Sequence, residues 1–170
     1  MSEETPDTPI LSAEDIAGGA FGFRHPLAPE TGCTMAVMSR RAGMSTVAVN
    51  LVRIAPGRQA FPAHRHHAEE EWVYVVSGIA DVSLDGTWHR LDAGGFAAFL
   101  PGGPAHAVRN AGESELVCLM GGSQPPAEIV DFPDYGKRVA FASGQGTMTD
   151  MADGTPFNFA DAMGPVEETP

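Results

Sequence analysis

The chain has 170 residues, 43% of them hydrophobic, which suits one globular domain with a sizeable core and excludes a disordered chain. Its 22 acidic and 10 basic residues give a net charge of −12, which argues against binding to nucleic acid. No apolar run approaches the roughly 20 residues that span a bilayer, and the acidic N-terminus lacks a signal-peptide pattern, so we expect no membrane partner and a cytoplasmic location.

The N-terminal part of the chain is predicted to hold little regular structure. Residues 1–10 have the composition of an acidic, solvated tail. Ser12 and Asp15 are spaced like the two partners of a capping box, and they predict a short helix over 12–17 before Gly18-Gly19.

From Phe21 onward the chain has the pattern of short strands. Two β-rich segments, 33–40 and 45–54, are separated by a turn at 41–43. Asp85-Gly86 stands between two alternating runs and predicts a tight hairpin. The other predicted strands are 72–77, the hairpin strands 79–84 and 87–91, then 96–100, 105–110 and 115–121. Closely spaced strands without long helices predict an antiparallel sandwich or barrel.

The pattern loosens beyond Gly122, where prolines interrupt the chain. Residues 139–142 are predicted to add one more strand, and Thr155 is predicted to cap a short helix that continues to Met163. We therefore expect a β-barrel over 11–143 and an extension over 144–170. The extension is expected to pack on the barrel, and a lid over the site is the alternative.

The segment before the predicted strand 72–77 concentrates titratable side chains. His64 and His66 are two residues apart, so on an extended strand both side chains leave the same face, and Glu71 follows across a turn or bulge. Two imidazoles and a carboxylate form a three-ligand set for a divalent first-row metal.

A second segment adds one more histidine. It has the spacing Gly95-x5-Pro101-x-Gly103-x2-His106-x3-Asn110. With this segment the chain resembles the cupin superfamily, whose motifs are G-x5-H-x-H-x3,4-E-x6-G and G-x5-P-x-G-x2-H-x3-N. The second motif fits at all five fixed positions, and the first fits at His64, His66, Glu71 and Gly78. The resemblance covers residues 45–121.

Two positions depart from the family pattern. Gly57 lies one residue further from His64 than the first motif requires. Many cupins carry Gly-Asp at the start of the second motif, whereas this chain has Gly94-Gly95-Phe96. The second departure leaves the geometry of that turn open, because the aspartate usually braces it.

The resemblance implies an all-β fold, the cupin-type antiparallel β-barrel (double-stranded β-helix or jelly roll). In such a fold His64, His66, Glu71 and His106 would converge on one divalent transition metal per chain, which could be Mn, Fe, Ni, Co, Cu or Zn. Four protein ligands leave up to two octahedral positions open for a small molecule.

The function implied by the resemblance is that of a metal-dependent enzyme acting on a small oxygenated metabolite. Such an enzyme would be a dioxygenase, a decarboxylase, an isomerase or a lyase, and Glu71 or a bound water would move protons. The alternative is a non-catalytic cupin that binds a small ligand as a sensor or carrier. A homodimer is expected, since dimers are common among resembling cupins.

Several side chains compete with these candidates. His67 is expected to point to the face opposite His66, and Glu69 and Glu70 compete with Glu71, which is favoured by its distance to Gly78. Arg65 and Arg109 adjoin inward-facing histidines and are expected to point outward. His25 and His89 are isolated histidines with no assigned role.

The remaining predictions concern packing. Cys33 and Cys118 are expected to be reduced thiols in the core, because no CxxC pair or secretion signal accompanies them. Asn110 is expected to brace a turn. The residues predicted to line the pocket around the metal are Phe61, Val73, Val75, Phe99 and Val108.

Overall fold

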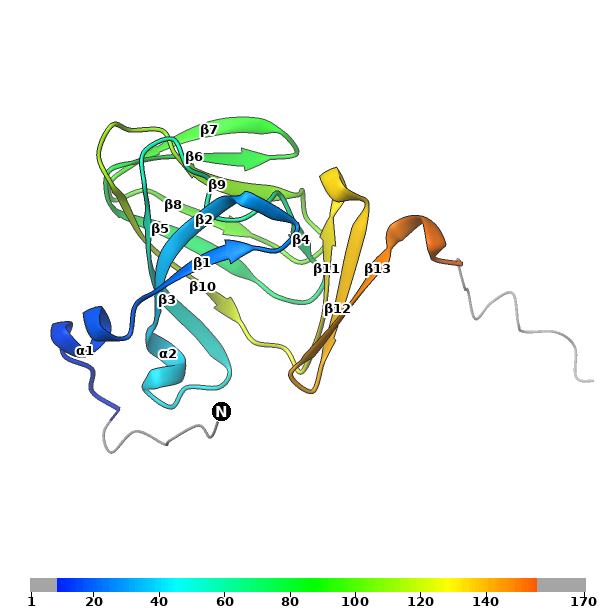
Figure 1. Ribbon diagram of the computed structural model, residues 1–170, viewed down its shortest axis with the longest axis horizontal. Coiled ribbons are helices and arrows are strands. Elements are labelled where there is room, and N and C mark those ends of the chain that lie inside the picture. The colour runs from blue at the N-terminus through cyan, green and yellow to red at the C-terminus, as the bar shows by residue number, and fades with distance from the viewer. Residues whose placement is uncertain (1–8, 156–170) are drawn as a thin grey trace, which may run out of the picture.

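Three antiparallel sheets make up the computed structural model, which describes residues 9–155 (Figure 1). The first sheet has six strands in the order β1-β2-β3-β10-β5-β8, the second has the order β13-β12-β11-β4, and the third has the order β7-β6-β9. The predicted all-β, jelly-roll fold class is confirmed, although the three sheets do not join through backbone hydrogen bonds into one closed sheet.

The elements follow one another along the chain with short connections. They are α1 (Ala13–Gly18), β1 (Phe21–His25), β2 (Ala28–Val37), α2 (Met38–Arg41), β3 (Val47–Ile54), β4 (Arg65–His66), β5 (Glu71–Ser77), β6 (Ile79–Leu84), β7 (Thr87–Asp92), β8 (Phe96–Phe99), β9 (His106–Asn110), β10 (Leu116–Ser123), β11 (Ala127–Phe132), η1 (Pro133–Tyr135), β12 (Lys137–Ala142), β13 (Gln145–Asp150) and η2 (Met151–Asp153). No helix among the described residues is long and apolar enough to cross a membrane.

The predicted N-terminal helix is confirmed as α1. The Asp15 amide donates to Ser12 Oγ at 3.1 Å, and the Ser12 amide donates to the Asp15 carboxylate at 2.8 Å, so the capping box is complete.

The strand predicted over 33–40 was too long at its C-terminal end. It ends at Val37, and residues 38–41 form the short helix α2 instead. The buried Ser39 explains the difference, because its hydroxyl accepts a hydrogen bond from the Val49 amide at 3.0 Å and holds the turn against β3. This partner is ten residues away along the chain and is invisible to local β-propensity.

The predicted hairpin at Asp85-Gly86 is confirmed. Asp85 and Gly86 have φ values of 45° and 82°, as a type I′ turn requires, and they join β6 to β7. The Gly94-Gly95 turn forms without an aspartate. Gly94 has a φ of 87° and donates its amide to the Val75 carbonyl at 2.9 Å, so backbone hydrogen bonds hold this turn.

Two strands near the C-terminus, β11 and β13, were not predicted. β12 includes the predicted strand 139–142, but it pairs on one side with β11 and on the other with β13 (Figure 1). Prolines at 125, 126 and 133 flank β11 and give that region the composition of a loop. Most of the helix predicted from Thr155 to Met163 lies outside the described residues.

The main core fills the space between the six-stranded and three-stranded sheets. Its fully buried members include Val52, Ile54, Val75, Leu116 and Cys118. Cys33 and Cys118 are both buried and free, as predicted, and burial raises the pKa of their thiols to about 11 and about 12. A smaller cluster of Val130, Phe132 and Val139 packs with Leu27 and Tyr135 beside the main core.

Candidate metal centre

Backbone pairing brings the two halves of the site together. His64 and His106 face each other across an isolated antiparallel bridge, with the His64 amide donating to the His106 carbonyl at 3.0 Å and the reverse bond at 2.7 Å. His66 lies on β4, and Glu71 begins β5. The four residues predicted from the two motifs are therefore neighbours in space.

The three imidazole rings converge on one carboxylate oxygen. Glu71 Oε2 lies 2.8 Å from His106 Nε2, 3.2 Å from His66 Nε2 and 3.4 Å from His64 Nε2. One donor atom from each of the four residues lies within 4.8 Å of all the others. Ligands about 2.1 Å from a metal lie at most about 4.2 Å apart, so a small inward shift of these side chains would suit a bound cation.

Charge and burial act in opposite directions at this cluster. Burial disfavours the ionised form of Glu71, but the neighbouring His106, His64 and His66 rings hold the pKa of its carboxyl well below the usual range. Burial also lowers the pKa of His106, against the opposing effect of Glu71. For His66 burial acts downward, but the hydrogen bond and negative charge of Glu71 outweigh it and raise the pKa.

The tautomer of His64 indicates what kind of group the cluster can bind. His64 Nδ1 lies 2.8 Å from the Pro62 carbonyl oxygen, which can only accept, so Nδ1 carries the hydrogen. In the neutral ring, Nε2 then holds a lone pair that faces the Glu71 carboxylate at 3.4 Å. Two acceptors facing each other need a proton or a cation between them. A divalent cation placed there would bind this lone pair, the carboxylate and the other two rings at once.

His66 has a second ring nitrogen with no hydrogen-bond partner. Its Nδ1 is buried and unpaired among the described residues, 3.6 Å from Glu69 Oε2 and 4.0 Å from Glu128 Oε2. Burial raises the pKa of Glu69 to about 7. Histidines that bind metals commonly donate their other N–H to a carboxylate, and these two glutamates stand where such an acceptor is needed. The donor set therefore fits a divalent transition metal.

Glu128 holds the loop between His66 and Glu71. Its carboxylate accepts hydrogen bonds from the amides of residues 67–69, including the His67 amide at 2.8 Å, and also from the Ile129 amide at 2.7 Å. Glu128 is only 8% exposed, and its carboxyl oxygens take their hydrogen bonds from backbone N–H groups.

Asp131 holds the same segment from the other side of β11. It is 1% exposed and accepts hydrogen bonds from Arg138 Nε at 2.6 Å, His67 Nε2 at 2.9 Å and Arg65 Nε at 3.4 Å. β11 also pairs with β4 through Val130 opposite His66 and Asp131 opposite Arg65. β11 thus anchors the strand that carries His66.

Sequence reasoning missed Glu128 and Asp131. The run Glu128-Ile129-Val130-Asp131-Phe132 places two acidic residues inside an otherwise apolar strand-like segment. This combination indicates that the two acidic residues have specific partners, because carboxylates on a buried strand require hydrogen-bond or ion-pair partners. The partners that belong to the site segment lie about 60 residues earlier, and only the tertiary structure reveals them.

Apart from Glu69, which lies beside His66, the competing candidates point away from the four donors or lie on the surface. His67 and Arg65 contact Asp131, and Arg109 binds Asp81 at 2.8 Å and stacks on the Trp88 ring at 4.0 Å. Glu70 and His89 are exposed. His25 lies against Phe132 with 4.9 Å between ring centroids and 44° between ring planes, and burial lowers its pKa.

Asn110 braces the turn that follows β9. Its Nδ2 donates to the Ile54 and Ser114 carbonyls, both at 2.8 Å, and its Oδ1 accepts from the Gly112 amide at 2.8 Å. This arrangement fully uses a side chain that is 2% exposed. Asn110 therefore has the structural role that the sequence predicted for it.

A small cavity adjoins the donors. Its volume is about 10 Å³, roughly the space for one water molecule. Phe61, Val73, Phe99 and Val108 line it together with His64, Glu71 and His106. Val75, which was also predicted to line the pocket, is fully buried in the core further along β5 and does not line this cavity.

Comparison with known proteins identifies the family. Residues 50–121 match the family model described as the cupin domain. This chain is a cupin-domain protein. The matched region contains all four donors, and no protein of curated function matches the chain.

Solved structures place this cupin beside two bacterial proteins. A putative sugar phosphate isomerase from Acidithiobacillus ferrooxidans is 29% identical, with a TM-score of 0.83, and the match covers 89% of this chain and 97% of that one. A sugar phosphate isomerase from Silicibacter pomeroyi is 27% identical, with a TM-score of 0.72, covering 81% of this chain and 90% of that one. A predicted oxalate decarboxylase from Thermotoga maritima is 18% identical, with a TM-score of 0.57 and coverage of 68% and 99%, and it shows the fold alone.

Proposed function

We propose that this cupin is a metal-dependent enzyme that isomerises a small phosphorylated sugar, with His64, His66, Glu71 and His106 as the ligands of one divalent transition metal. The observation that carries the metal site is the lone pair of His64 Nε2 facing the Glu71 carboxylate at 3.4 Å, inside a cluster of three imidazoles. The reaction class comes from the two neighbours described as sugar phosphate isomerases.

The chemistry of the site suits this reaction. A divalent cation bound there would polarise a carbonyl oxygen of the substrate. An aldose–ketose isomerisation also needs a group that moves a proton between adjacent carbons, and Glu71 is the carboxylate we assign to that role. A carboxylate has two oxygens, so Glu71 can face the three rings with Oε2 and still offer Oε1 to a substrate proton.

The size of the cavity favours a second candidate function. A space of about 10 Å³ holds a water but not a sugar. Catalysis on a sugar phosphate would therefore require the residues around Phe61 and Phe99 to move apart. A non-catalytic cupin that binds the metal and a ligand smaller than a sugar would need a smaller movement, and a turnover assay separates these two functions.

The metal site is tested first. Protein purified without a histidine tag is assayed by elemental analysis, and Mn, Fe, Co, Ni, Cu and Zn affinities are measured by calorimetry. His106→Ala should lower metal affinity by more than about a hundredfold. Loss of a residue that only hydrogen-bonds to a metal ligand already costs about 10- to 100-fold, and loss of the ligand itself costs more. His89→Ala removes an exposed histidine and is the matched control. Equal affinities for both variants would overturn the metal site.

The reaction is tested on the metal-loaded protein. Aldose and ketose phosphates are incubated in D2O and followed by NMR, because proton transfer between adjacent carbons exchanges solvent deuterium into the sugar. Interconversion with deuterium incorporation that His106→Ala abolishes would support the isomerase. Saturable binding of a sugar phosphate that is recovered unchanged and undeuterated would contradict it and favour the non-catalytic alternative.

A further inference from the structure

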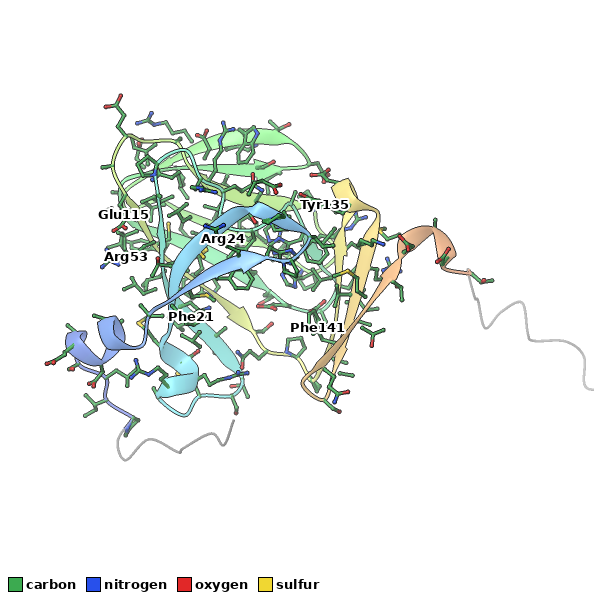
Figure 2. All side chains as sticks on the ribbon, in the orientation of Figure 1. Phe21, Arg24, Arg53, Glu115, Tyr135 and Phe141 are labelled. Carbon is green, nitrogen blue, oxygen red and sulfur yellow. The ribbon has the colours of Figure 1, made fainter. Side chains whose placement is uncertain are left out.

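A second site candidate lies on the outer face of the six-stranded sheet, at the end formed by β1, β2 and β3. A groove of about 540 Å³ runs over this face and is lined by Arg24, Arg53, Arg58, Gly32, Thr34 and Glu115, among others. Figure 2 shows Arg53 and Glu115 together at one flank of the barrel, with Arg24 on the strand beside it.

The groove lies on the opposite face of the sheet from the metal-ligand cluster. Cys33 and Val52 point into the core, and the residues that follow them in the strands, Thr34 and Arg53, are exposed and face each other across β2 and β3. Alternate residues of a strand point to opposite faces. A molecule seated in the groove therefore cannot contact the four donors.

The charge of the groove is opposite to that of the whole protein. The chain carries a net charge of −12 and only 10 basic residues, yet three arginines line this one groove. Glu115 is the one acidic side chain lining it, and it pairs with Arg53 at 2.8 Å. Three arginines against one glutamate leave two positive charges, which matches a dianion.

The arginines retain free hydrogen-bond donors. Arg24 has no hydrogen-bond or ion-pair partner among the described residues. Arg58 uses one amino group to donate to the Glu30 carbonyl at 2.8 Å, which fixes its side chain and leaves its other N–H groups available. Guanidinium groups recognise phosphate oxygens through paired, charge-assisted hydrogen bonds.

Small residues leave room between these arginines. Gly22 faces open space, and a side chain on Gly32 would collide with the Phe23 carbonyl oxygen at 2.7 Å. Thr34 stands opposite Gly22 in the β1–β2 pair. The floor of the groove is therefore backbone and short side chains, with the long cationic side chains around it.

We propose that this groove binds a phosphate-type dianion, either free or as the phosphate group of a phosphorylated metabolite, at a site separate from the metal centre. The inference does not depend on the isomerase proposal, because it rests on the arginines and on the face of the sheet that carries them.

Inorganic phosphate is the probe for the first test. Its binding is measured by ³¹P NMR titration at fixed ionic strength, with sulfate as a competitor and chloride as the salt control. Arg24→Gln and Arg53→Gln should each weaken phosphate binding by on the order of tenfold, since each removes hydrogen bonds to a charged group. Arg90→Gln is the matched control, because Arg90 also pairs with an exposed acid, Asp92, at 2.9 Å but lies outside the groove. Unsaturable binding, or equal loss in Arg90→Gln, would overturn the site.

Two further measurements distinguish the groove from the metal centre and from a dimer interface. His106→Ala should lose metal affinity yet keep phosphate binding. If phosphate binding instead disappears in His106→Ala and survives in Arg24→Gln, the anion binds at the metal centre, and the groove proposal is contradicted. Sedimentation of Arg24→Gln should match that of the wild type. If the wild type is a dimer that binds no phosphate and Arg24→Gln is a monomer, the groove is an interface between copies of the chain. A sugar monophosphate that binds more tightly than inorganic phosphate would identify the phosphorylated metabolite as the ligand.

Discussion

Each imidazole of the candidate metal centre is oriented by a different kind of neighbour. The Pro62 carbonyl fixes the tautomer of His64, and the unpaired nitrogen of His66 faces Glu69. The His106 ring stacks on Phe99 with 3.8 Å between centroids and 1° between planes. Orientation of the ligands by their surroundings is worth roughly 10- to 100-fold in metal affinity. The apolar neighbours of the site are therefore expected to matter as much as its polar ones.

Phe99→Leu tests this expectation at the scale of one residue. Leucine keeps the site apolar but removes the flat surface on which His106 stacks, so metal affinity should fall by about tenfold. Calorimetric titration with Zn²⁺ and Co²⁺ measures the effect. Phe96→Leu on the same strand is the control, because Phe96 is 59% exposed and points outward. Unchanged affinity in Phe99→Leu would show that the ring does not position His106.

At the scale of elements, β11 determines where the ligand-bearing loop lies. Its two buried carboxylates hold that loop from different sides, Glu128 through backbone amides and Asp131 through the side chains of Arg65 and His67. The backbone pairing of β4 with β11 is only two residues long. Side-chain interactions therefore supply much of the attachment.

Asp131 should make stability depend on pH. Hydrogen bonds from Arg138, together with His67, hold the pKa of this carboxyl below its usual range. The folded state therefore binds fewer protons than the unfolded state, and the stabilisation is fully present above the unfolded pKa of about 4 and is lost as the pH falls toward the folded pKa. Asp131→Asn should lower the free energy of unfolding by about 3 kcal/mol at pH 7, and by progressively less below about pH 4.

Urea unfolding of both proteins at pH 7 and pH 3 measures this difference. Asp150→Asn is the control, because its pair with Lys137 is exposed and should contribute less than about 1 kcal/mol. A difference between wild type and Asp131→Asn that does not change with pH would contradict the assigned cause.

At the scale of the whole molecule, the six-stranded sheet has an unusually apolar outer face at its β5–β8 end. Tyr74, Val76 and Phe96 are between 39% and 59% exposed there. The arginine groove lies at the other end of the same sheet, beyond β10. Exposed apolar patches of this kind are typical of protein–protein contacts.

We predict a homodimer that buries this apolar end. Sedimentation velocity at micromolar concentration should show a dimer for the wild type and a monomer for Tyr74→Asp, because a buried charge without a partner destabilises an interface. Met148→Asp is the control, since Met148 is also exposed but lies on β13. A monomeric wild type would disprove the prediction.

The sequence alone was enough for the local features and for the residue types of the site. The capping box at Ser12, the type I′ hairpin at Asp85-Gly86 and the alternation of the barrel strands depend on residues within a few positions of one another. The spacing of His64, His66 and Glu71 was visible for the same reason, and His106 was found through the spacing of the second motif. The helix α2 was missed because the partner of Ser39 lies ten residues further along the chain, and β11 was missed because the prolines around it give the segment the composition of a loop.

Which groups face one another depends on how distant parts of the chain pack together, and it became visible in the three-dimensional structure. It showed that the lone pair of His64 meets a carboxylate, that Glu128 accepts amides some 60 residues away, and that three arginines from separate segments share one groove. It also showed that the cavity beside the donors has room for about one water molecule. Spacing along a strand determines the face from which a side chain leaves, but the distance across a fold depends on how the sheets pack.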